Sequence, residues 1–180
     1  GKNHCFEQQD DLALFDVWND IIHGGNEPTP TKGMEWFRPQ EGRDKVREQF
    51  RNMEAQNPRF AYGTTDLPLE DQSSGLVAGQ TMRYLEHPKD ETFALWVSFP
   101  DPHEPWMVAE KYAAMFPPDK IDLPPWREGE FDDERSPERH RVLYKMLGLE
   151  DDPTEHLSGL NAAYFGMAPF LDSPLRPTPA

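Results

Sequence analysis

His103 is the residue whose type and setting best suit it for chemistry. It lies within the stretch Pro-Asp-Pro-His-Glu-Pro at positions 100–105. The ordinary pKa of an imidazole is near neutrality, so His103 can accept or donate a proton at physiological pH. Because each proline ring fixes one backbone φ angle, the prolines of this stretch restrict the loop. The sequence therefore predicts a stiff loop that presents a general acid, a general base or a hydrogen-bond donor.

An apolar run, Thr92–Phe99, comes directly before this loop. It is bounded by charged residues on one side and by Pro100 on the other. A run that is apolar on both faces is typical of a strand buried in a sheet that helices cover. Since ligands of α/β sheets bind beyond the carboxyl ends of the strands, His103 is expected at such a binding edge.

A helix is expected over residues 70–87, before this strand. Its helical periodicity rests on Val77, Thr81, Tyr84 and Leu85. Oxygens that could cap its start belong to Asp71, Ser73 and Ser74. Pro88 ends it, because a residue before proline avoids the α conformation. The order of helix, short loop and buried strand predicts an α/β fold with a central sheet and flanking helices.

Four other segments also have helical character. They are 43–56 (with Val46, Phe50 and Met53 on one face), 111–116, 137–148 (with Pro137 in its first turn) and 159–172. Long Pro-rich loops connect them. Residues 14–22 fit either a short amphipathic helix or an irregular packed segment. We expect a single domain over 1–180, with 27–69 as a variable excursion and 173–180 as an atypical tail.

Composition excludes several classes of protein. The 180 residues include 18 Lys and Arg against 33 Asp and Glu, a net charge of −15, which makes nucleic acid a poor partner. No apolar stretch approaches the roughly 20 residues of a membrane span. Cys5 is the one cysteine, so an intrachain disulfide and a Cys-cluster zinc site are excluded. The aromatic content of 12% is that of a globular domain rather than of an acidic tail.

Three segments, taken in order, resemble the sulfatase family of the alkaline-phosphatase superfamily. The first is Gly1-Lys2-Asn3-His4, which is similar to the family's G-K-x-H motif. The second is 93–106, similar to an apolar strand followed by S-F-x-x-P-H-x-P, and it continues through the Pro-Pro-Asp-Lys-Ile-Asp-Leu-Pro-Pro stretch at 117–125. The third is 163–172, similar to the family's Y-x-x-M-x-x-x-D helix. Each motif is weak alone, but their order makes the set specific.

The resemblance implies a partial sulfatase-like central sheet and hydrolysis of sulfate monoesters, on a small molecule or a sulfated sugar. Lys2 corresponds to the lysine that contacts sulfate, and a compact ammonium suits a tetrahedral anion. His4 corresponds to the histidine beside the formylglycine hydrate. His103 corresponds to the histidine near the ester oxygen, as a donor to sulfate or to the leaving group. These residues are the expected catalytic (His4, His103) and substrate-binding (Lys2, His103) groups.

The family's cofactors depend on residues that this sequence lacks. Formylglycine is made from Cys or Ser within C-x-P-S-R or S-x-P-S-R, and neither motif occurs here. The Ca²⁺ ligands of the family belong to segments that have no counterpart in this sequence, so no metal ligand is assigned. We therefore expect an internal fragment of a sulfatase that is inactive by itself.

Two alternatives to the sulfatase interpretation stay open. One is a phosphonate monoester or phosphodiester hydrolase of the same superfamily. The other is a non-catalytic acidic module that binds a partner or a sugar. The remaining histidines show no ligand spacing, and they are expected to have surface or packing roles: His23, His87, His140 and His156.

Overall fold

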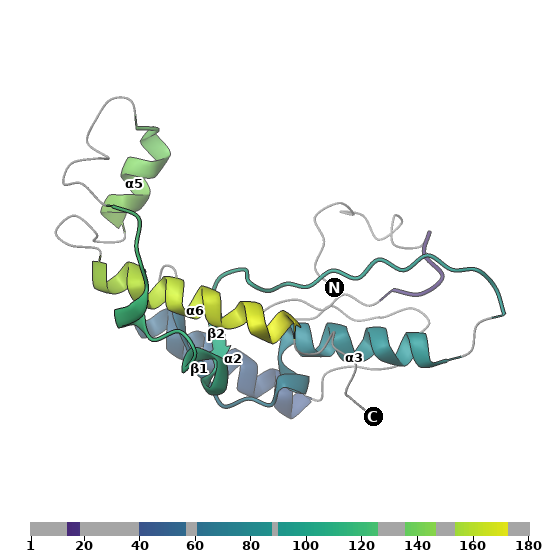
Figure 1. Ribbon diagram of the computed structural model, residues 1–180. Helices are drawn as coiled ribbons and strands as arrows, with labels where there is room; N and C mark the ends of the chain where they lie inside the picture. The colour runs from purple at the N-terminus through teal and green to yellow at the C-terminus, as the bar shows by residue number, and fades with distance from the viewer. Residues whose placement is uncertain are drawn as a thin grey trace.

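The computed structural model describes residues 14–18, 40–56, 61–87, 90–125, 136–146 and 154–172. Within these ranges the protein combines helices with a small parallel sheet of two strands (Figure 1). The coarse expectation of a mixed α and β architecture is met.

The sheet joins two segments that are far apart in the sequence. Strand β1 spans Tyr62–Thr65 and strand β2 spans Trp106–Ala109. They pair in parallel, with a register that runs from Tyr62 opposite Trp106 to Thr65 opposite Ala109. All four residues of β2 are buried, as in a strand covered on both faces.

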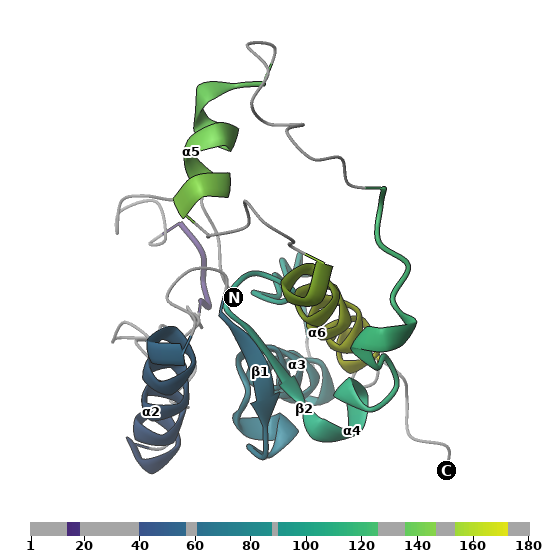
Figure 2. The same cartoon turned by 90° about the vertical axis from the view of Figure 1, so that its left-hand side faces the viewer.

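Two helices cover the two faces of β2. Alternate side chains of a strand point to opposite faces, so that Val108 faces one helix and Met107 faces the other. Val108 belongs to a core with Trp106, Ala109 and Tyr112 and, from helix α6 (Thr154–Asp172), with Ala163, Met167 and Phe170. Met107 belongs to a second core with Val46, Met53, Ala61 and Leu67, beside helix α2 (Gln40–Gln56). Figure 2 shows α2 and α6 on opposite sides of the strands.

Small residues bring α6 close to the sheet. The buried face of α6 includes Ala162, Ala163 and Gly166. A Cβ atom placed on Gly166 would lie 2.8 Å from Cγ2 of Val108, closer than a carbon–carbon contact permits. A larger side chain at this position would push the helix away from β2.

Most of the predicted helices are confirmed. Segment 43–56 lies within α2, where Val46 and Met53 are buried and Phe50 is half-buried. The segment 70–87 contains helix α3 (Ser73–Glu86), and 159–172 lies within α6. The segment 111–116 overlaps the short helix α4 (Glu110–Ala113), and 137–148 contains α5 (Glu138–Met146). Short 3-10 turns span Leu69–Asp71 and Pro118–Lys120.

The predicted capping of α3 is wrong. The N-cap residue is Gln72, Asp71 belongs to the preceding 3-10 turn, and Ser73 and Ser74 lie inside the first helical turn. The 3-10 turn ends only at Asp71, so the helix begins too late for Asp71 to cap it.

The prediction of a buried strand over Thr92–Phe99 is also wrong. The described chain forms no strand there, and Phe93, Leu95 and Trp96 are 44%, 43% and 63% exposed. The segment runs alongside α3 instead (Figure 1), with Val97 and Phe99 packed on Leu76 and Val77 of the helix. An apolar run becomes a buried strand only where a hydrogen-bonded neighbour and a covering layer are both present. In the described part of the chain, a helix alone covers this run.

The remaining sequence predictions concern the expected excursion, the segment 14–22 and the tail. Residues 40–69, within the expected excursion, supply α2 and β1 to the core. Residues 14–17 form turns and bends rather than helix and Trp18 lies in a β-bridge, whereas 19–22 and the tail 173–180 lie outside the described residues.

Candidate functional site

Hydrogen bonds tie the loop of residues 100–105 to its surroundings. The backbone N–H of His103 donates to the carbonyl of Pro100 at 3.2 Å. The indole N–H of Trp106 donates to the carbonyl of Pro102 at 3.0 Å, and its backbone N–H donates to the carbonyl of Ala61 at 2.9 Å. The peptide bonds before Pro102 and Pro105 are cis. The predicted stiff loop is thus held at its end by the first residue of β2.

The His103 side chain lies at the surface with its Nδ1 atom against Glu104. Its side chain is 44% exposed. The Nδ1 atom lies 2.7 Å from the backbone carbonyl oxygen of Glu104 and 3.1 Å from Oε2 of the same residue. The imidazole is therefore accessible to a ligand and its orientation is fixed by a neighbour.

Asp101 connects this loop to helix α3. Burial raises the pKa of its carboxyl above the ordinary value of 3.8. The nearby hydroxyl and backbone N–H of Ser74, and a positive charge on His103, act on this pKa in the opposite direction. Ser74 itself is fully buried in the first turn of α3. Asp101 thus faces the helix start, where backbone N–H groups favour a carboxylate, but burial outweighs this effect and favours the neutral form.

The predicted place of His103 at the carboxyl end of a strand is wrong. Because residues 92–99 form no strand, the loop instead leads into the amino end of β2. In the parallel register Trp106 lies opposite Tyr62, so the amino end of β1 is at the same edge. His103 therefore lies near the amino-terminal edge of the sheet.

The other predicted site residues, Lys2 and His4, lie outside the described residues. Their approach to His103 stays a prediction. Asp101 was assigned no role from the sequence, and the contact of the Glu104 side chain with His103 was not predicted. Their signal in the sequence is the alternation of acidic residues and proline on both sides of His103.

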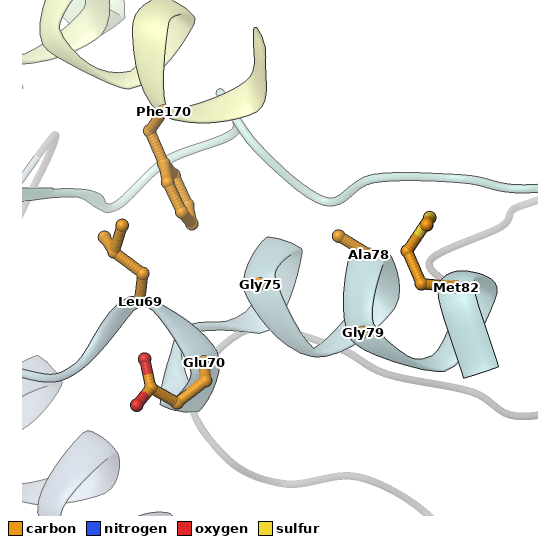
Figure 3. A pocket seen from close by; sticks show the side chains of 7 residues that line it. All are labelled: Leu69, Glu70, Gly75, Ala78, Gly79, Met82 and Phe170. Carbon is orange, nitrogen blue, oxygen red and sulfur yellow. The ribbon is translucent and has the colours of Figure 1, made fainter. Parts of the chain in front are cut away.

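A separate cavity of about 280 Å³ lies between α3 and the end of α6. Figure 3 shows Leu69 and Phe170 pointing toward each other across it, whereas the carboxylate of Glu70 points away from them. The lining residues are Leu69, Glu70, Gly75, Ala78, Gly79, Met82 and Phe170. This cavity is mainly apolar and contains none of the predicted site residues.

Within the described ranges, no three His, Cys, Asp or Glu side chains gather in a way that could hold a metal ion. None of the described helices is both long and apolar enough to cross a bilayer.

Comparisons of the chain with protein-family models, with curated proteins and with solved structures gave no match.

Proposed function

We propose that this chain is a section of a sulfatase-like hydrolase and that His103 is one of its sulfate-binding histidines. The observation that carries the proposal is the ordered set of motifs: Gly-Lys-Asn-His at 1–4, the Pro-His-Glu-Pro loop and the 163–172 helix. The exposed imidazole on a loop fixed by hydrogen bonds supports the same role.

The chemistry proposed for His103 is donation of a hydrogen bond by its protonated form, the imidazolium. Cleavage of a sulfate ester develops negative charge on the sulfate and on the leaving oxygen, and donors that are oriented in advance stabilise that charge. Lys2 would add a positive charge and His4 would accept a proton, as the resemblance implies. Since the family's Ca²⁺-ligand segments and its C/S-x-P-S-R motif have no counterpart in this sequence, calcium and the formylglycine are proposed to belong to residues outside these 180.

Binding of inorganic sulfate to the full chain tests the proposal. Sulfate, with chloride at matched ionic strength as the reference, should shift the NMR signals of the His103 ring more than those of His87. His87 is a matched control, because it is also exposed and its Nδ1 also lies near a carbonyl, that of Arg83, at 2.6 Å. Equal shifts at both rings, or none at His103, would contradict the proposal.

This chain should hydrolyse neither an aryl sulfate nor an aryl phosphonate ester, since it lacks C/S-x-P-S-R. Two other measurements separate the alternatives. If phenylphosphonate shifts the His103 ring much more than sulfate does, the phosphonate hydrolase is favoured. If the coding sequence around these residues has no C/S-x-P-S-R motif, the non-catalytic module is favoured.

A further inference from the structure

We infer that Glu104 is the positioning residue of His103 and holds its neutral imidazole in the Nδ1–H tautomer. The inference deepens the proposed function, because it concerns the same histidine. It rests on two contacts of one ring nitrogen, 2.7 Å to the Glu104 backbone oxygen and 3.1 Å to the Glu104 carboxylate.

The chemistry of the two partners decides which atom carries the hydrogen. A backbone carbonyl oxygen only accepts hydrogen bonds, and so does an ionised carboxylate. A ring nitrogen that lies against both must therefore be the donor. In a neutral imidazole one nitrogen is the donor and the other the acceptor, so Nδ1 carries the hydrogen and Nε2 has the lone pair.

This arrangement determines which ring atom can act on a ligand. The Glu104 contacts occupy Nδ1, so proton transfer to or from a ligand takes place at Nε2. The neutral ring accepts a proton there, and the imidazolium donates from the same atom. A hydrogen bond to the other ring nitrogen is the usual means by which proteins fix the tautomer and direction of a functional histidine.

The side chain of Glu104 can be removed without disturbing the core. Glu104 and its carboxylate are exposed, with the side chain 50% accessible. Glu104→Ala removes the carboxylate and leaves the backbone carbonyl in place. Glu104→Gln keeps a side-chain oxygen that accepts a hydrogen bond but has no charge. Glu91→Ala is a matched control, because Glu91 is exposed on the segment before the loop.

The test is ¹⁵N NMR of the histidine rings in the full chain, at a pH where they are neutral and without ligand. The Nδ1–H form should predominate at His103 in the wild type, in Glu104→Gln and in Glu91→Ala. It should lose population to the Nε2–H form in Glu104→Ala. A wild-type ring in the Nε2–H form, or no change in Glu104→Ala, would overturn the inference.

The two proposals fail in distinguishable ways. The tautomer is measured without sulfate, so a correct tautomer with no sulfate response leaves the positioning role intact and contradicts the sulfatase role. A sulfate response with an unchanged tautomer in Glu104→Ala does the reverse.

Discussion

Burial shifts the pKa values of two described residues, Asp101 and His156. Asp101 is pressed against the start of α3, and burial is the first cause of its raised pKa. His156 is half-buried beside Tyr62, with ring centroids 5.6 Å apart, and burial lowers the pKa of its imidazole below 6.5. In both cases the folded state favours the neutral form.

Replacing Asp101 should change how stability depends on pH. Below pH 3.8 the carboxyl is protonated in both the folded and the unfolded chain, so it carries no burial penalty. As the pH rises from 3.8 through the higher pKa of the folded state, the carboxyl ionises more readily in the unfolded chain, so the folded state loses stability. Asp101→Asn should therefore gain stability relative to the wild type as the pH rises above 3.8. Urea unfolding at several pH values measures the difference, and the same change at exposed Asp122 is the control.

The effect of His156 on stability should have the opposite dependence on pH. Its contribution to stability is present above pH 6.5 and is lost as the pH falls through the lower pKa of the folded state. His156→Gln should therefore lose less stability than the wild type on acidification below pH 6.5. His140→Gln, at an exposed position, should follow the wild type. Identical acid unfolding curves for His156→Gln and the wild type would contradict this expectation.

At the residue scale, sequence reasoning identified His103 and its proline loop but not their partners. The loop was predictable because proline restricts its own backbone, whereas the functional role of His103 stays a prediction. The roles of Asp101 and of Glu104 were not predictable. Asp101 lies against Ser74, which is far from it in the sequence. The contact of Glu104 with His103 depends on how the loop turns.

Helix α3 shows how one element can hold two glycines for different reasons. A Cβ atom on Gly75 would overlap the backbone carbonyl of Leu69, in the 3-10 turn before the helix. A Cβ atom on Gly79 would have nothing within 4 Å. The first glycine permits the close approach of the turn, whereas the second leaves open space at the apolar cavity.

Alanine at these two positions should therefore have opposite effects. Gly75→Ala should lower the free energy of unfolding by about 1–3 kcal/mol, because a rigid backbone atom must move. Gly79→Ala should raise it by about 0.5–1 kcal/mol, since alanine is the better helix former. Denaturant titrations of the pair measure both values. A loss of stability in Gly79→Ala equal to that in Gly75→Ala would contradict the packing described here.

The helices were predictable at the element scale and the strands were not. The faces of α2 and α6 repeat at helical spacing over several turns, which a sequence displays directly. Strands β1 and β2 have only four residues each, which is too short for an alternating pattern to stand out, even though Tyr and Thr in β1 favour strands. The apolar run 92–99 has the composition of a strand, but composition does not specify the neighbour that a strand needs.

At the scale of the whole molecule, apolar side chains remain exposed along the run beside α3. We call Phe93, Leu95 and Trp96 the apolar strip. Exposed apolar surface of this kind favours association and marginal stability. We therefore expect a broad thermal transition at low temperature; a sharp, high-temperature transition of the monomer would contradict it.

Polar substitution of the apolar strip should reduce binding of hydrophobic dyes. Leu95→Gln combined with Trp96→Gln should lower ANS fluorescence and concentration-dependent association, with no loss of helical circular dichroism. Leu14→Gln is the control, because Leu14 is 83% exposed but lies outside the strip. Unchanged ANS binding in the double variant would show that the dye binds elsewhere.

The position of Trp106 gives the His103 loop an optical reporter. Trp106 is 8% exposed and its indole N–H donates to the carbonyl of Pro102, whereas Trp96 is 63% exposed. A buried indole emits at shorter wavelength than a hydrated one, so the emission of Trp106 should shift to the red when the loop detaches from β2. With Trp18, Trp36 and Trp126 replaced by Phe, iodide, which quenches accessible indoles, should quench Trp96 first and leave a residual blue-shifted signal from Trp106.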